Sequence, residues 1–210
     1  FGKLIGWADE RLNHPATAES QREEYGFMTI AALLVGAVAL GSLLDDAFEG
    51  WGGLGLGADT QIIAILLAQK SLAAHVGQVA RRLRGGGLEG GRRAVAMIVG
   101  RDPETLDEAG VSRAAIETLA ENASDGVVAP AFWYAVFGLP GLFAYKMLNT
   151  ADSMIGHRTE RHRAFGRASA RLDDLGNWLP ARLPALMIVL AGGWSDFGAR
   201  RDVVMRDAKL

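Results

Sequence analysis

The chain has 210 residues, of which 50% are hydrophobic, and its 22 basic and 24 acidic side chains give a formal net charge of −2. A net charge so close to zero gives no indication of nucleic-acid binding. The absence of cysteine excludes a disulfide framework and a thiolate metal site. The mean hydropathy is slightly positive, which is high for a soluble protein, and the length suits one or two domains.

The first 25 residues are charged and mixed in composition. Leu4, Ile5, Ala8 and Leu12 recur at the spacing of an amphipathic helix. We expect this helix to lie at a membrane interface and to end at Asn13-His14-Pro15. The chain starts without Met and without a signal-peptide pattern, so we expect a fragment of a longer protein.

Apolar stretches follow along the chain. Phe27–Leu44 carries no charge and approaches the roughly 20 residues that cross a bilayer. The other three are Leu54–Val76, Val127–Tyr145 and Leu183–Trp194; buried core helices are the alternative reading of the second and the fourth. We predict an all-α, multi-pass integral membrane helical bundle, with residues 1–210 forming a single membrane domain.

The distribution of arginine predicts the topology. Residues 45–59 contain four acids and no Lys or Arg, whereas residues 77–126 are rich in arginine, so the positive-inside rule puts the former outside the cytoplasm and the latter inside. The segment after Tyr145 is also basic, however. Pro130 and the turn-like Gly138–Gly141 favour a re-entrant helical hairpin at 127–145, which keeps both basic flanks on one side.

Two segments before residue 112 contain candidate motifs, a phosphate-binding loop and a helix start. RLRGGGLEGGRR, residues 82–93, lacks the Gly-Lys-Ser/Thr ending of a phosphate-binding loop, and we predict a flexible cytoplasmic loop over residues 81–93. Asp102 and Pro103 are typical of a helix start, with Asp102 as N-cap. Arg101 is a candidate anion contact.

The segment SRAAIETLAENASDGVVA, residues 112–129, has a helical apolar period with Ser112 as its candidate cap. Glu117, Glu121 and Asp125 fall four residues apart on one face, with Asn122 beside them, and Gly126 is expected to end the helix. Like charges at this spacing repel by a few tenths of a kcal/mol. The pattern indicates an external cation or a basic partner; a solvated acidic face is the alternative.

The segment YKMLNTADSMIG, residues 145–156, follows the third apolar stretch. Lys146, Asn149 and Ser153 share a helical stripe, with Asp152 to one side. These polar groups are candidates for a binding site. A lysine at the end of an apolar run also commonly snorkels to the membrane surface, which is the alternative for Lys146.

The segment RLDDLGNWLPAR, residues 171–182, contains two adjacent acids. Asp173 and Asp174 fall on different faces, Pro180 ends any helix, and Arg182 borders the next apolar stretch. Paired aspartates with a nearby asparagine suit Mg²⁺, which takes oxygen ligands and substrate phosphates. The alternative is a surface turn.

Together these motifs resemble one family. ETLAENASDGVVAP, YKMLNTADSMIG and ARLDDLGNWLPARL are similar to the central block of the adenosylcobinamide-phosphate synthase family, densely over residues 100–183 and more loosely over residues 1–93. In that family another apolar segment and a Gly-Asp-Pro…His-Pro stretch precede the position of Phe1. A His-Arg-Ser-Pro-Asn-like motif follows the position of Leu210.

The resemblance implies a multi-pass enzyme of the cell inner membrane, with its site facing the cytoplasm. It implies ATP-dependent amide formation between adenosylcobyric acid and aminopropanol or its O-phosphate in cobalamin biosynthesis. We expect ATP and Mg²⁺ as cofactors. The expected partners are the corrinoid substrate, the lipid bilayer and a homo-oligomer or other cobalamin-pathway enzymes, without nucleic acid.

Roles for individual residues follow as hypotheses from this chemistry. The metal ligands would be Glu121, Asp125, Asp173 and Asp174. The catalytic groups would be Glu117, as general base, and Lys146, which would also contact phosphate or the corrin. The residues binding substrate or phosphate would be Arg101, Asn122, Asn149, Asp152 and Arg182.

Two other functions remain open from the sequence. One is a non-catalytic membrane scaffold or carrier that presents the corrin to a soluble partner enzyme. The other is a membrane alcohol-phosphotransferase with an acidic Mg²⁺ cluster, although its usual spaced aspartate motif is not visible in this chain.

Overall fold

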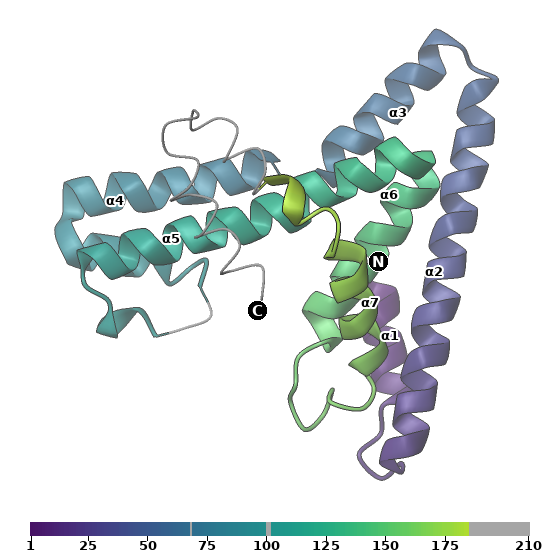
Figure 1. Cartoon of the computed structure of the whole chain (residues 1–210), viewed down its shortest axis with the longest axis horizontal. Coiled ribbons are helices and arrows are strands. Elements are labelled where there is room, and N and C mark those ends of the chain that lie inside the picture. Colours follow the sequence, from purple (N-terminus) through teal and green to yellow (C-terminus); the bar gives the residue numbers. More distant parts are fainter. Residues whose placement is uncertain (68, 100–101, 185–210) are drawn as a thin grey trace. The chain divides into compact units, whose positions relative to one another are not determined.

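The computed structural model describes residues 1–67, 69–99 and 102–184, which form helices and connecting turns without a strand in those ranges (Figure 1). The α-helices are α1 (Gly2–Leu12), α2 (Glu19–Glu49), α3 (Gly53–Leu66), α4 (Gln69–Val95), α5 (Glu108–Ala123), α6 (Ala129–Ile155) and α7 (Arg167–Asn177). A 3₁₀ turn, η1 (Pro103–Thr105), precedes α5, and a π-helical turn, η2 (Ser124–Val128), follows it. The predicted all-α class is confirmed.

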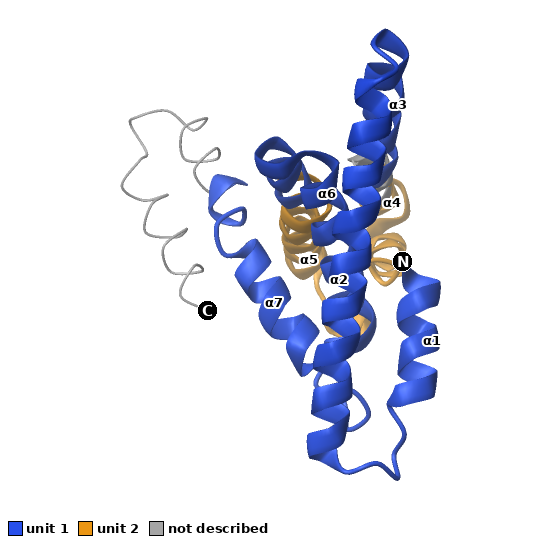
Figure 2. Ribbon diagram, turned by 90° about the vertical axis from the view of Figure 1, so that its right-hand side faces the viewer, with its two compact units in different colours: residues 1–66, 129–210 blue, residues 67–128 orange. Residues whose placement is uncertain are grey.

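The chain divides into two compact units (Figure 2). Unit 1 comprises Phe1–Leu66 and Ala129–Leu210, and unit 2 comprises Leu67–Val128. Each unit has its own hydrophobic core. The assignment of residues 1–210 to a single membrane domain stays a prediction.

Two helical stretches are long and apolar enough to cross a membrane, Glu19–Glu49 and Glu108–Ile155. In the most apolar window of α2 only 22% of the residues are buried, and Phe27, Val35 and Leu43 are all exposed. A core helix of a soluble protein would bury such residues. These two helices indicate membrane association, and the number of passes stays a prediction.

The other apolar stretches differ from expectation. The second gives α3, a helix of 14 residues that ends at Leu66, which is shorter than a perpendicular span requires. The rest of this stretch, up to Val76, belongs to α4, which starts at Gln69. The fourth stretch lies outside the described residues from position 185 onward.

The core of unit 1 lies between α2 and α6, with α1 and α7 packed on the same pair. Its fully buried side chains include Ile5, Ile30, Leu139, Leu142 and Phe165, each of which contributes about 1.5–3 kcal/mol when buried. Glycine permits the closest approach of backbones. A Cβ at Gly41 of α2 would lie 2.5 Å from Pro140 of α6.

The predicted helix–turn–helix at 127–145 is confirmed within α6, which reverses at Gly138 (φ 65°, ψ −151°). Residues 129–137 form a first arm and residues 139–155 a second arm (Figure 1). The first N–H groups of the second arm have no acceptor within the helix. The carboxylate of Asp45 accepts the Leu139 N–H, as an N-cap side chain does, and Pro140 has no N–H to satisfy. The first arm is tied to α3 by the Tyr134 hydroxyl, which donates to Asp59. The re-entrant position of this hairpin in a bilayer stays a prediction.

Unit 2 packs α4 beside α5, and its buried core residues are Val79, Val95, Val111, Ala114 and Ala115. The flexible loop predicted at 81–93 is wrong, since these residues are part of α4. Leu83 and Leu88 pack on the core of unit 2, and this burial outweighs the low helix propensity of the glycines. Gly87 (φ 60°) makes the bend between the two parts of α4.

The ends of α5 correct two further expectations. Asp107, not Ser112, is the N-cap, since its carboxylate accepts the Gly110 N–H at 2.7 Å. Gly126 does not end the helix. Gly126 lies in the π-helical turn η2, which continues from α5. The Ser124 N–H still bonds to the carbonyls of Ala120 and Glu121 in α5.

Other predicted boundaries are confirmed. Asn13 is the C-cap of α1, and Asp102 caps the 3₁₀ turn by accepting the Glu104 N–H at 3.0 Å. Helix α7 ends at Asn177, before Pro180. These boundaries depend on local chemistry, which the sequence shows directly.

Candidate functional site

The second arm of α6 carries the predicted polar stripe of Lys146, Asn149 and Ser153, with Asp152 to one side. Lys146, Asn149 and Asp152 are each partly buried. The Thr150 hydroxyl donates to the Lys146 carbonyl and the Ser153 hydroxyl to the Asn149 carbonyl. Because the hydroxyls of Thr150 and Ser153 bond to the helix backbone, the longer polar side chains on this arm are those of Lys146, Asn149 and Asp152.

Asp152 lies where α6 ends. A Cβ at Gly156 would approach the Oδ1 of Asp152 to 1.9 Å, so glycine gives this carboxylate its space. The side chains of Asp174 and His157 both interact electrostatically with Asp152. Carboxylates from α6 and α7 therefore lie within electrostatic range of each other in unit 1.

Helix α7 presents its two acids in different ways, as predicted. Asp173 is buried, with 7% of its surface exposed, whereas Asp174 is exposed. The Oδ2 of Asp173 accepts from the Asn177 amide at 2.9 Å, and the Oδ1 of Asn177 accepts from the Tyr145 hydroxyl at 2.7 Å. This chain of hydrogen bonds fixes α7 against α6 and orients Asp173.

Sequence reasoning did not assign Tyr145 a role in the site, and it noted Asn177 only as the asparagine near the paired aspartates. The spacing of Asp173 and Asn177, one helical turn apart, is the local signal that points to their bond. The contact from Tyr145 joins two helices that are distant in sequence, and no local pattern indicates it.

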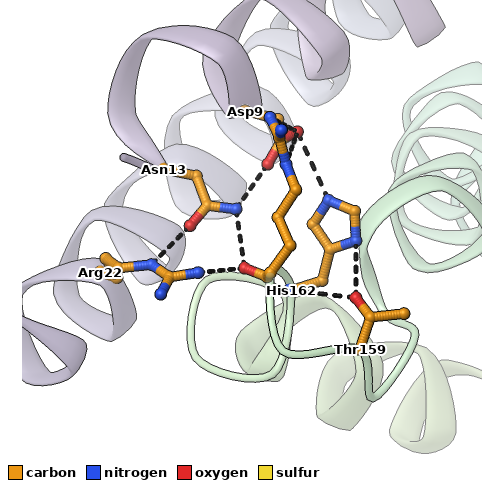
Figure 3. Close-up of polar contacts among 6 residues, drawn as sticks. Asp9, Asn13, Arg22, Thr159 and His162 are labelled. Atoms are coloured by element: carbon orange, nitrogen blue, oxygen red, sulfur yellow. Dashed lines mark hydrogen bonds and ion pairs between the residues drawn. The ribbon is translucent and has the colours of Figure 1, made fainter. Parts of the chain in front are cut away.

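The connection between α6 and α7 is anchored on α1 by a polar cluster (Figure 3). Arg161 donates to the Oδ2 of Asp9 through Nη2 at 2.8 Å and Nε at 3.2 Å. The Nε2 of His162 lies 3.4 Å from the same oxygen, and the Asn13 amide donates to the Oδ1 of Asp9 at 2.7 Å. Asp9 thus accepts hydrogen bonds both from the end of α1 and from the segment between α6 and α7.

Further bonds extend this cluster to α2. The Asn13 amide also donates to the Arg161 carbonyl at 3.0 Å, and the Nε of Arg22 donates to the Oδ1 of Asn13 at 2.7 Å (Figure 3). Burial alone raises the pKa of Asp9, but the bonds from Asn13, Arg161 and His162 outweigh it, so the pKa of Asp9 lies below its ordinary value. Asp9 is therefore held as a carboxylate.

The remaining predicted residue of unit 1, Arg182, is exposed. Its guanidinium lies 4.2 Å from the centre of the Trp178 ring and donates to the Trp178 carbonyl. Arg182 is thus held one turn beyond α7, where its exposed side can meet an anion.

In unit 2, the predicted acidic line lies along α5 and η2. Glu117 and Glu121 are exposed, and Asp125 is partly buried in the π-helical turn. The Asn122 amide donates to the Thr118 carbonyl at 2.9 Å. π-Helical turns frequently mark functional positions, and Asp125, a predicted metal ligand, lies in this one. Arg101 lies outside the described residues.

The candidate site residues are divided between the units. Lys146, Asn149, Asp152, Asp173, Asp174 and Arg182 belong to unit 1, and Glu117, Glu121, Asn122 and Asp125 belong to unit 2. Among the side chains that the structure describes, no three His, Asp or Glu form a group able to hold a metal ion. A joint site of both sets therefore stays a prediction.

Comparison with known proteins decides the family. The family model described as CobD/Cbib protein matches residues 1–210, which is the whole chain. The chain belongs to the CobD/CbiB family. No solved structure matches it.

Several curated relatives in the CobD/CbiB family carry the name Cobalamin biosynthesis protein CobD. The relative from Brucella anthropi is 56% identical and the one from Rhizobium meliloti 58%, and each alignment covers 100% of this chain and 65% of the relative. The relative from Rhodobacter capsulatus is 46% identical, over 98% of this chain and 70% of its own length. The chain thus spans about 65% of the length of the first two relatives.

Proposed function

We propose that this chain forms the membrane part of a cobalamin-biosynthesis enzyme that joins aminopropanol, or its O-phosphate, to a propionate of adenosylcobyric acid with ATP. The observation that carries the proposal is the family match over residues 1–210, together with the name that the relatives share. The polar face of α6 beside the acids of α7 supports it, because amide ligation needs charged groups of both signs.

The reaction sets the requirements for the site. A carboxylate oxygen attacks the γ-phosphorus of ATP, so that an acyl phosphate forms and ADP leaves. The amine then attacks the acyl carbon, phosphate leaves, and a base takes the proton from nitrogen. We assign the base to Glu117.

Magnesium would be held by carboxylates. Asp173 and Asp174 of unit 1 and Glu121 and Asp125 of unit 2 are the acids that we propose as its ligands, because hard cations prefer carboxylate oxygens. When bound, Mg²⁺ neutralises phosphate charge. Asn177 keeps one oxygen of Asp173 oriented at 2.9 Å, which is the support a metal-binding carboxylate requires.

The other residues would bind the substrates. Lys146 and Arg182 carry the positive charge that phosphates or corrin carboxylates need, and Arg101 would do the same. Asn149, Asn122 and Asp152 offer hydrogen bonds to amides and hydroxyls. Their partly buried or exposed positions keep them accessible to a substrate.

We place the enzyme in the cell inner membrane as a multi-pass protein with this site facing the cytoplasm. The basic segments on both sides of the α6 hairpin support this orientation, because cytoplasmic flanks are rich in Lys and Arg. Substrates with phosphate and carboxylate groups would reach such a site directly from the cytoplasm.

A carrier that presents the corrin to a soluble partner enzyme is the second candidate. It is favoured by the finding that the described side chains do not form a three-residue metal group. Such a carrier would bind adenosylcobyric acid but would not hydrolyse ATP in its presence.

The test uses the full-length protein with Glu121→Gln, since this change removes a charge and keeps the shape. We expect at least a tenfold loss of ligation rate, as for removal of a group that stabilises transition-state charge, with unchanged membrane expression. Glu104→Gln is the matched control, because Glu104 is an exposed acid of the same unit. Near-normal turnover of Glu121→Gln would contradict the assignment.

A further inference from the structure

A cavity of about 460 Å³ lies in unit 1 between α2, both arms of α6 and α7. Its walls include Leu34 and Val38 of α2, Trp133 and Phe137 of the first arm, Ala144 of the second arm and Gly176 of α7. A volume of this size is typical of small-molecule sites, about 300–1,000 Å³. Tyr145 also lines the cavity and contacts the candidate site through its hydroxyl, which bonds to Asn177.

The cavity wall offers a ligand very little hydrogen bonding. Its polar side chains are Trp133 and Tyr145, and both are already engaged. The Trp133 Nε1–H donates to the Gly176 carbonyl at 3.0 Å, and the Tyr145 hydroxyl donates to Asn177 at 2.7 Å. A polar ligand would lose its bonds to water without replacement. The occupant should therefore be apolar.

The position of the cavity residues along α2 indicates the depth of the cavity in a membrane. Leu34 and Val38 lie at the centre of Phe27–Leu44, the stretch of α2 without charge. If α2 spans the bilayer, this level is the middle of the hydrocarbon layer. Phe137 and Val38 remain 59% and 43% exposed, so the cavity opens outward from these helices. Acyl chains surround a protein at this depth.

We infer that this cavity binds one acyl chain of a membrane phospholipid, which fills the space between α2 and the α6 hairpin. The inference rests on the membrane embedding in the proposed function. An apolar cavity does not attract water, and if empty its walls lose dispersion contacts. A flexible hydrocarbon chain restores these contacts.

Trp133 provides the measurement, because it lines the cavity. The full-length protein in detergent is titrated with phosphatidylcholine brominated in the middle of its acyl chains, and tryptophan fluorescence is recorded. The contribution of Trp133 is the difference between the wild type and Trp133→Phe, which separates it from the other tryptophans. We expect saturable quenching of this contribution at about one lipid per chain, because one cavity of this volume holds one chain.

Variants test the position of the lipid. Ala144→Leu fills the cavity and should weaken the apparent affinity about tenfold, by analogy with the cost of overpacking a core. Val35→Leu is the matched control, since Val35 is 69% exposed on α2 and does not line the cavity. Gly176→Ala is a milder second variant, because its Cβ would lie 3.4 Å from the nearest atom, in Leu148.

Three outcomes would overturn the inference: quenching that does not saturate, equal quenching in Ala144→Leu and Val35→Leu, or cross-links showing that a second copy fills the cavity. Alkaline carbonate extraction distinguishes this failure from failure of the membrane embedding. A protein that stays in the membrane without saturable quenching contradicts the lipid site alone. A protein released by carbonate contradicts the embedding as well.

Discussion

The Nη2 of Arg161 lies 2.8 Å from the Oδ2 of Asp9, although 152 positions separate the two residues in the sequence. This ion pair joins α1 to the segment between α6 and α7. Since α6 carries Lys146 and Asp152 and α7 carries Asp174, the pair constrains the connection between the two helices of the candidate site. Asp9 is a positioning residue in this account.

Asp9→Ala should destabilise the protein by about 1–3 kcal/mol, because the amide of Asn13, which is 2% exposed, loses its carboxylate partner. The measurement is the thermal midpoint of the full-length protein in detergent. Glu10→Ala is the control, since Glu10 is the exposed neighbour on the same helix, and it should shift the midpoint little. Equal midpoints for both variants would show that the cluster does not hold α1.

The stability of the protein should also depend on pH through Asp9. Because the pKa of Asp9 in the folded state lies below its ordinary value of 3.8, the ionised carboxylate contributes stability at neutral pH. This contribution is complete above the unfolded pKa and is lost as the pH falls through the folded pKa. The difference in unfolding free energy between the wild type and Asp9→Asn should therefore stay constant from pH 7 to about pH 5 and shrink below about pH 4. A difference that does not vary with pH would contradict this role.

Gly138→Ala should destabilise the hairpin of α6. The residue has φ 65°, and a Cβ would lie 2.8 Å from the Oδ2 of Asp45. A backbone with φ 65° and ψ −151° is essentially restricted to glycine, and an L-residue there costs about 1–3 kcal/mol. Gly36→Ala is the control, since a Cβ there has no neighbour within 4 Å and alanine favours the helix by about 1 kcal/mol. The thermal midpoint should fall for Gly138→Ala and stay equal or rise for Gly36→Ala.

Substitutions of the two adjacent acids of α7 should differ in their effects on stability and on ligation. Asp173→Ala should lower both, since Asp173 is buried and accepts a bond from Asn177, and loss of a buried partner costs about 1–3 kcal/mol. Asp174→Asn changes an exposed side chain and should leave stability within about 0.5 kcal/mol while reducing ligation. The checks are the thermal midpoint and the ligation rate of the full-length protein. Normal ligation by Asp174→Asn would remove Asp174 from the site.

The parts of the fold that depend on local chemistry could be predicted from the sequence. The end of α1 at Asn13, the reversal at Gly138 and the end of α7 before Pro180 all follow from residues within a few positions. Local propensity misled where tertiary packing decides. The glycine-rich segment is helical on both sides of the bend at Gly87, because Leu83 and Leu88 pack on a core formed with α5.

The candidate site shows the same division. The stripe of Lys146, Asn149 and Ser153 and the different exposure of Asp173 and Asp174 follow from helical periodicity. The cluster around Asp9 could not be predicted, because its partners come from a segment about 150 residues away. A single sequence contains no signal for such a pair. The meeting of the acids of α5 with those of α7 stays a prediction for the same reason.

The most direct test of the ligation proposal is the mass of the corrin product. The full-length protein, purified in detergent, is incubated with adenosylcobyric acid, aminopropanol phosphate, Mg²⁺ and ATP, and parallel reactions omit ATP or Mg²⁺. We predict a corrin heavier by aminopropanol phosphate minus one water, with one ADP released per amide and no product in either omission. An unchanged corrin mass, with the corrin bound but no ADP released, would contradict ligation and identify a carrier.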